Sequence, residues 1–181
     1  MPQFRRWGVA EQGFWRGWFT LPRVVTEGAD KLPRFQPHPQ LETLRKKAIP
    51  WGRKELTAPW TLPDAAETAW EILLEIPAQQ QTGGLLLQVG NCFALELTLV
   101  SRTLHAYVKD TGEQTMQDCG TLQLAPGVPV RLQVFLDRCS AEIFADGKCL
   151  SVNVFDTAPQ RPVSLIPQGG TLPLQLLQVW Q

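Results

Sequence analysis

Long hydrophobic runs are missing from this sequence of 181 residues. Its longest apolar stretches, such as residues 85–87, have the length of a strand, whereas a membrane-spanning helix needs about 20 apolar residues. The first residues also lack the basic and then apolar pattern of a secretory signal peptide. The sequence therefore predicts a protein that is cytoplasmic and has no membrane partner.

An excess of charge of one sign is missing as well, because 17 lysines and arginines balance 17 aspartates and glutamates. Binding to nucleic acid depends on a basic stripe or patch that neutralises phosphates. The sequence contains no such stripe, so nucleic acid is not an expected partner.

Metal-ligand spacings and a catalytic histidine pattern are absent too. None of the four cysteines stands in a Cys-x-x-Cys pair, and neither His38 nor His105 has the spacing of a zinc ligand. No serine near either histidine lies in a Gly-x-Ser-x-Gly elbow, which argues against a Ser-His-Asp hydrolase. We therefore expect no metal and no cofactor, with His38 solvated in a linker and His105 an ordinary sheet residue.

The cysteines are expected to be reduced residues of the core or the surface, with one disulfide as the alternative. They are Cys92, Cys119, Cys139 and Cys149.

Turn-forming residues are plentiful, with 15 prolines and 14 glycines along the chain. Short apolar stretches lie between them, which is typical of an all-β protein and not of a helical bundle. In residues 93–99 every second residue is a phenylalanine or leucine, and this alternation predicts an antiparallel sheet that is covered on one side. About ten strands are enough for two packed sheets, so we predict an antiparallel β-sandwich of the jelly-roll or lectin-like kind.

The positions of the strands follow from the alternation and the turns. Residues 67–76 are ambiguous, because Ala65-Ala66-Glu67 would also start a helix, but the alternation favours a strand. Asp146-Gly147 is a two-residue hairpin signal. The predicted strands are 67–76, 85–90, 93–99, 103–108, 130–136, 141–145, 149–155, 163–166 and 174–180.

The N-terminal part differs from the rest. Residues 1–25 are rich in aromatics and include a predicted strand at 18–21, so we expect a hydrophobic strand pair that needs a partner surface, or alternatively a platform on which sugars stack. Residues 26–50 are predicted to be a linker with a short helix over 39–47, and residues 51–181 are predicted to form the sandwich. The aromatics are Trp7, Phe14, Trp15, Trp18 and Phe19.

Several blocks of sequence, in the same order, resemble glycoside hydrolase family 32, the invertases and β-fructosidases. Residues 15–23 (WRGWFTLPR) resemble the end of the family's five-bladed propeller, and residues 35–45 (FQPHPQLETLR) resemble its linker. Residues 134–144 (VFLDRCSAEIF) and 163–180 (VSLIPQGGTLPLQLLQVW) resemble strands of its C-terminal β-sandwich. The chain departs from the family at Cys139, where serine is usual, and in the looser linker.

The resemblance implies a non-catalytic role for this chain. Retaining glycosidases need two carboxylates about 5 Å apart, and in this family they lie in Asn-Asp-Pro and Glu-Cys segments, with an Arg-Asp-Pro segment for sugar hydroxyls. The sequence contains none of these segments, so no catalytic residue is assigned. The parent reaction would be hydrolysis of terminal β-fructofuranosides such as sucrose. Residues 1–25 would be a remnant of the last propeller blade.

The resemblance also implies partners and alternatives. The expected partner is the catalytic propeller, with support of stability or oligomerisation as the role, and a second copy could pair through residues 1–25. The alternative is a free-standing carbohydrate-binding or self-assembling module.

Two sets of polar residues are candidate sites. Asp137 and Glu142 could form a carboxylate pair, but we expect Asp137 to shape a turn and Glu142 to point to solvent or to an interdomain surface, with Arg138 bridging to a neighbour. A second set could line a concave sheet face and bind sugar, or could be an exposed polar face. Its members are Glu96, Arg102, Tyr107 and Lys109.

Overall fold

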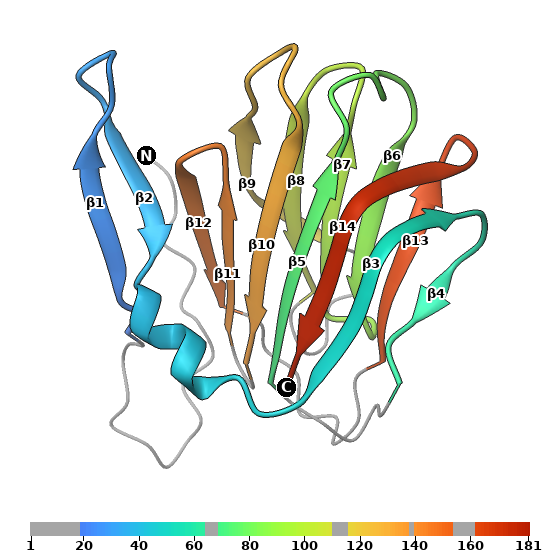
Figure 1. Cartoon of the computed structure of the whole chain (residues 1–181), viewed down its shortest axis with the longest axis horizontal. Coiled ribbons are helices and arrows are strands. Elements are labelled where there is room, and N and C mark those ends of the chain that lie inside the picture. The colour runs from blue at the N-terminus through green and yellow to red at the C-terminus, as the bar shows by residue number, and fades with distance from the viewer. Residues whose placement is uncertain (1–18, 64–68, 110–115, 138–139, 154–161) are drawn as a thin grey trace.

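The computed structural model describes residues 19–63, 69–109, 116–137, 140–153 and 162–181. Within these ranges the chain forms two six-stranded antiparallel sheets that face each other, with a separate two-stranded hairpin beside them (Figure 1). This arrangement confirms the predicted all-β sandwich.

The first sheet has the strand order β12-β11-β10-β5-β14-β3. Its strands are β3 (Ala48–Leu56), β5 (Trp70–Ile76), β10 (Val130–Leu136), β11 (Ser140–Ala145), β12 (Lys148–Asn153) and β14 (Leu172–Trp180). The second sheet has the order β4-β13-β6-β7-β8-β9. Its strands are β4 (Trp60–Thr61), β6 (Gly84–Val89), β7 (Phe93–Thr98), β8 (Thr103–Val108), β9 (Gln117–Gln123) and β13 (Val163–Gln168).

The core lies between the two sheets and is built by the alternation of the strands. Successive side chains of a strand point to opposite faces, and the inward set of the first sheet includes Ile72, Leu74 and Val134, all fully buried. Leu87 and Phe93 meet them from the second sheet and are also fully buried. The strands predicted from alternation are therefore confirmed over their described residues, and the turn at residues 146–147 joins β11 to β12.

The ambiguous segment is the central strand β5, which pairs with β10 on one side and β14 on the other. Both faces of β5 are buried, because the outward Glu71 and Leu73 are covered as well as the inward residues. Residues 65–67, where a helix could have started, lie outside the described residues.

The predicted linker contains a hairpin and a shorter helix than expected. Strands β1 (Arg23–Glu27) and β2 (Pro33–Pro37) pair only with each other among the described residues, so both are edge strands and the prolines at the ends of β2 are tolerated. The predicted 39–47 helix is the 3-10 helix η1 (Pro39–Leu44), capped by His38. It ends before Arg45, whose backbone is extended.

The predicted strand at 18–21 is wrong for the described residues 19–21, which are irregular. Pairing begins at Arg23, opposite Pro37, and the carbonyl of Pro22 accepts a hydrogen bond from the backbone N–H of His38 at 3.0 Å. Strands β1 and β3 run across the predicted boundaries at residues 25/26 and 50/51. Residue 18 and the aromatics before it lie outside the described residues.

Strand β9 was not predicted, because its sequence QDCGTLQ has little apolar alternation. It is an edge strand with a register irregularity opposite Ala106 and Tyr107, and it contains Gly120. Such edges need few apolar residues, since only one neighbour and one face bury them.

The C-terminus is tied to the segment that follows η1. The backbone N–H of Lys46 donates to the carbonyl of Gln181 at 2.8 Å, and the N–H of Gln181 donates to the carbonyl of Lys47 at 3.0 Å. Gln181, which follows β14, therefore lies beside the segment that leads into β3.

Candidate functional site

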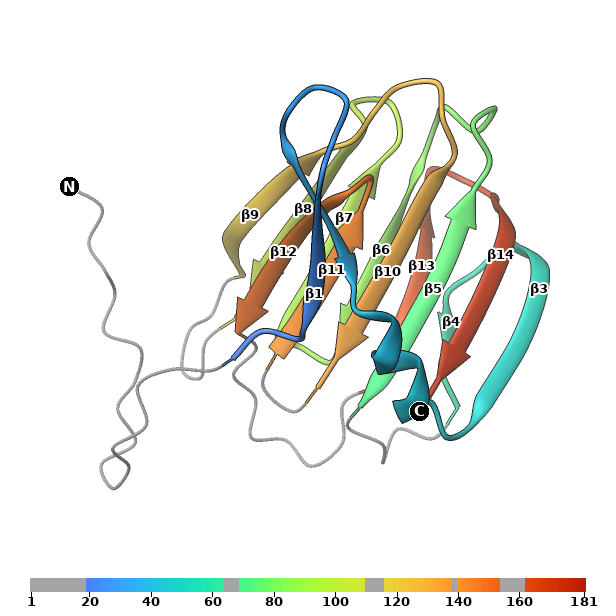
Figure 2. The ribbon, with the colours of Figure 1, turned by 60° about the vertical axis from the view of Figure 1, so that its left-hand side comes forward.

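The β1–β2 hairpin lies against the outer face of the first sheet, beside β11 and β12 (Figure 2). The backbone N–H of Phe35 donates to the carbonyl of Gly147 at 2.8 Å. A side chain at Gly147 would place its Cβ 2.5 Å from Cδ of Arg34, and Gly147 has a φ of 70°, so glycine is required here on two grounds. The β11–β12 turn is thus shaped to receive the hairpin.

A buried charge cluster lies under the hairpin. The Arg23 guanidinium donates to Oε2 of Glu142 at 3.2 Å and to Oγ of Ser151 at 3.1 Å, and it contacts Sγ of Cys149 at 2.7 Å. The Ser151 hydroxyl donates to the same Glu142 oxygen at 2.5 Å. The cluster joins the hairpin to two strands that lie more than a hundred residues later in the chain.

Glu142 was expected to point to solvent or to an interdomain surface, and its exposure of 1% shows that the first of these alternatives is wrong. It does lie on the outer face of β11, but the hairpin covers that face. Its Oε1 has no hydrogen-bond partner in the described part of the chain. Burial raises the pKa of Glu142 above its ordinary value, and the hydrogen bond from Ser151 and the charge of Arg23 only partly oppose this effect.

The other proposed member of the carboxylate pair has a local role. The backbone N–H of Asp137 donates to the carbonyl of Ser140 at 2.9 Å, which closes the turn between β10 and β11. The predicted turn role of Asp137 therefore agrees with this contact. Arg138 lies outside the described residues.

A second buried carboxylate, Glu71, fixes η1 to the same sheet. Arg45 holds it with two hydrogen bonds of 2.8 and 2.7 Å, and the side-chain amide of Gln133 donates to it at 2.7 Å. The guanidinium of Arg45 also lies 4.0 Å from the ring centroid of Trp180. Hydrogen bonds to Glu71 raise the pKa of Arg45 above its ordinary value, so the guanidinium stays charged.

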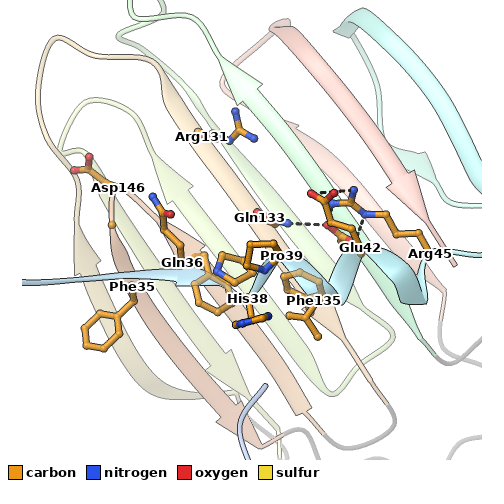
Figure 3. Close-up of a pocket in the computed structure, with 16 residues that line it drawn as sticks. Phe35, Gln36, His38, Pro39, Glu42, Arg45, Arg131, Gln133, Phe135 and Asp146 are labelled. Atoms are coloured by element: carbon orange, nitrogen blue, oxygen red, sulfur yellow. Dashed lines mark hydrogen bonds and ion pairs between the residues drawn. The ribbon is translucent and has the colours of Figure 1, made fainter. Parts of the chain in front are cut away.

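Between these two clusters lies a groove of about 480 Å³, with residues of β2 and η1 on one side and the outer face of the first sheet on the other (Figure 3). Arg131, Gln133 and Phe135 of β10 form part of its floor, and Gln36 and His38 come from the opposite wall. We call this space the linker groove. It brings His38, which was expected to be solvated, into a lined cavity where its Nδ1 accepts a hydrogen bond from the Gln40 N–H.

The polar set proposed for the other sheet is assembled only in part, because Glu96 and Tyr107 interact while the other two members lie at the ends of β8. Arg102 and Lys109 flank opposite ends of β8, and Arg102 donates to the carbonyls of Ala125 and Val128, so it anchors a loop. Glu96 lies opposite His105 in the β7–β8 register, and His105 stacks on Tyr107 with ring centroids 6.1 Å apart. Burial first, and then the charge of Glu96, raise the pKa of Tyr107.

Sequence reasoning missed the residues of the linker groove. The signal that could have found part of it is the outward set of β10, where an aromatic Phe135 follows Arg131 and Gln133 on a face that was assumed to be solvated. No periodicity could have shown that residues 35–45 cover this face.

Disulfides, metal sites and membrane-spanning helices concern the described residues alone. Among the described residues Cys92, Cys119 and Cys149 form no disulfide with one another, and Cys139 lies outside the described ranges. In these ranges no group of three or more His, Cys, Asp or Glu side chains is placed to hold a metal ion. Nor does any helix in them have the length and apolarity to cross a bilayer.

Comparisons with known structures agree with the fold. The chain is similar to a Bombyx mori GH32 beta-fructofuranosidase (18% identity, TM-score 0.64, 90% of this chain and 32% of that one). It is also similar to sucrose-6-phosphate hydrolase from Lactobacillus gasseri (15% identity, TM-score 0.59, 88% and 32%). A third similar structure is fructan 1-exohydrolase IIa from Cichorium intybus in complex with 1-kestose (10% identity, TM-score 0.64, 88% and 40%).

At these identities the similarity shows the fold, and the chain spans about a third of the length of the first two enzymes. No curated protein sequence matches the chain. The sequence model of the family described as "Glycosyl hydrolases family 32 C terminal" matches residues 40–181, which is most of the chain. The chain therefore belongs to glycosyl hydrolase family 32, as a C-terminal β-sandwich domain of that family.

Proposed function

We propose that this chain acts as the non-catalytic C-terminal module of a β-fructosidase that hydrolyses terminal β-fructofuranosides such as sucrose. In this proposal the catalytic carboxylates belong to a propeller domain, and the chain alone is not an enzyme. The module packs against the propeller and stabilises it. The family match over residues 40–181 and the names of the similar enzymes support this assignment.

The observation that carries the proposal is the distribution of exposed apolar side chains. Most large hydrophobic residues that the described part of the chain exposes lie in the hairpin, in η1 or just before them, whereas Val100 and Val128 lie on loops of the sandwich. Because these side chains share the segment that precedes the sandwich, this segment is the favoured surface for a partner. They are Phe19 (97% exposed), Val25 (58%), Leu32 (57%) and Leu44 (65%).

The two buried charge clusters give this surface a fixed position. Arg23 ties β1 to Glu142, and Arg45 ties the end of η1 to Glu71. A partner that binds the hairpin is therefore held in one orientation relative to the sandwich. A rigid attachment of this kind is what a supporting module needs, because a flexible tether would transmit no stability.

The test mixes the 181-residue chain with a family 32 propeller that lacks its own C-terminal domain. We expect a complex in gel filtration, a longer half-life of sucrose hydrolysis on heating, and no hydrolysis by the chain alone. Val25→Ser and Leu32→Ser should weaken the complex, while Val100→Ser should not. Hydrolysis by the isolated chain, or equal weakening by all three variants, would contradict the proposal.

Self-association is a second candidate, because the same exposed residues could join two copies of the chain. Sedimentation of the chain without a propeller distinguishes it. A dimer that dissociates on Val25→Ser would support oligomerisation, and a monomer at all concentrations would exclude it.

A further inference from the structure

The linker groove contains polar groups that the fold leaves without partners. In the described part of the chain, the Arg131 guanidinium and the Gln36 side-chain amide make no hydrogen bond or ion pair. Both side chains are exposed at the groove. They are therefore available to a ligand, unlike the Arg45 guanidinium, which Glu71 and Glu42 occupy.

His38 adds a donor of known orientation. Its Nδ1 accepts the hydrogen bond from the Gln40 N–H, so in the neutral ring the proton lies on Nε2. Nε2 can then donate a hydrogen bond away from η1. The groups open to a ligand therefore include donors from three residues, and acceptor oxygens from the amide of Gln36 and from Oδ1 of Asp146, whose Oδ2 accepts from the Ala125 N–H at 2.6 Å.

The floor of the groove is apolar between these polar groups. Phe135 and Phe144 meet edge to face, with ring centroids 6.0 Å apart, and Pro37 and Pro39 line the opposite wall. Figure 3 shows Pro39 and His38 beside Phe135, while Phe35 turns away from them. A ligand in the groove thus meets an apolar patch with donors and acceptors around it.

Acidic side chains outnumber basic ones in the lining of the groove, which does not favour an anion. Glu71 and Glu42 share the single cation of Arg45. Arg131 is the other cation of the lining, Asp146 lines the same groove, and Glu75 lies opposite Arg131 in the β5–β10 register. A phosphate or a polyanion would meet this negative charge, whereas an uncharged ligand would not.

We propose that the linker groove binds a neutral oligosaccharide. Each hydroxyl of such a ligand both donates and accepts, which suits the mixed set of Arg131, Gln36, His38 and Asp146, and its C–H faces suit Phe135. The volume of about 480 Å³ lies within the range of small-molecule sites, roughly 300–1,000 Å³. This site does not depend on the proposed attachment to a propeller, since all of its lining residues belong to this chain.

The test is titration of the 181-residue chain with two neutral trisaccharides, 1-kestose and maltotriose, followed by side-chain amide signals in NMR. We expect saturable shifts of the Gln36 and Gln133 amides with at least one of them. Arg131→Ala and Gln36→Ala should each weaken the affinity about tenfold, the loss expected for one or two hydrogen bonds. Both side chains are exposed and unpaired, so the variants should fold normally.

Tyr107→Ala is the matched control, because Tyr107 is a partly exposed aromatic on the outer face of the other sheet. It should leave the affinity unchanged. Loss of binding in Tyr107→Ala but not in Arg131→Ala would place the sugar on the second sheet and overturn the proposal. Absence of shifts with both sugars at millimolar concentration would overturn it as well, and so would tighter binding of sucrose 6-phosphate that Arg131→Ala abolishes.

Discussion

The outer faces of the two sheets have similar sequence patterns but different surroundings. On the first sheet the outward Glu71 and Glu142 are 6% and 1% exposed, because η1 and the hairpin cover them. On the second sheet the outward Glu96, His105 and Tyr107 stay partly exposed. Alternation along a strand therefore identifies the inward face, while the burial of the outward face depends on segments elsewhere in the chain.

The largest loss of stability should come from removing Arg45, which neutralises the buried Glu71 on the outer face of the first sheet. Arg45→Ala leaves Glu71 buried without its ion pair, and such changes destabilise by about 3 kcal/mol. Urea unfolding should show this loss, while Glu96→Ala on the second sheet should change the free energy of unfolding by less than about 0.5 kcal/mol. Equal losses in both variants would mean that the two outer faces do not differ.

A smaller effect should follow from disturbing the contact between the hairpin and the first sheet. Gly147 and Gly127 both have left-handed backbones, with φ of 70° and 73°. A Cβ at Gly147 would strike Arg34, but one at Gly127 would meet no atom within 4 Å. We expect Gly147→Ala to destabilise by about 2 kcal/mol and Gly127→Ala by about 1 kcal/mol, which is the backbone strain alone.

The difference between these glycine variants measures the docking of the hairpin. Thermal unfolding of both, together with proteolysis at the hairpin, would test it. If Gly147→Ala is no worse than Gly127→Ala, the contact of Arg34 with the β11–β12 turn contributes nothing.

Glu142 should make the stability of the covered outer face of the first sheet depend on pH, in contrast to the exposed outer face of the second sheet. Burial raises the pKa of Glu142 in the folded state. Its contribution to the free energy of unfolding is therefore complete below the ordinary glutamate pKa of 4.5, where the carboxyl is protonated. This contribution is lost as the pH rises through the raised pKa of the folded state. Glu142→Gln should therefore gain stability relative to the unmodified chain between about pH 4.5 and 7.

The measurement is the urea midpoint of both proteins over that range. Burial raises the pKa of the neighbouring Cys149 thiol, so that thiol stays neutral over this range. A stability difference that shrinks as the pH rises would show that the pairing with Arg23 outweighs burial.

The smallest effect is expected on the open face. Tyr107→Ala removes a ring that stacks on His105 but stays partly exposed, so the free energy of unfolding should change by no more than about 0.5 kcal/mol. Differential scanning calorimetry would detect a larger loss, which would mean that this face is packed more tightly than its exposure indicates.

The sequence predicts the inward half of this structure well, for a physical reason. Leu132, Val134 and Leu136 fall on one face of β10 because the side-chain period of a strand is fixed at two, and all are buried as expected. The hairpin at residues 146–147 is similarly local, since its backbone needs positive φ at both positions.

The candidate site could not be predicted in the same way. Glu142 is covered by Arg23, which lies 119 residues earlier in the chain, and the linker groove joins residues near position 36 to residues near position 133. Such contacts depend on how the hairpin packs, which no local pattern encodes. The two prolines of β2 exclude a central strand, but they show neither that these residues form an edge strand nor which surface that strand meets.

The hydrogen bonds that join Gln181 to Lys46 and Lys47 make the sandwich nearly a closed loop of chain. Its first and last strands could be linked covalently by a few residues without strain, and new ends could be opened at the turn around Gly169 and Gly170. A circular permutant built in this way should keep both sheets. The order of the strands along the chain can therefore change while the three-dimensional arrangement of the two sheets stays the same.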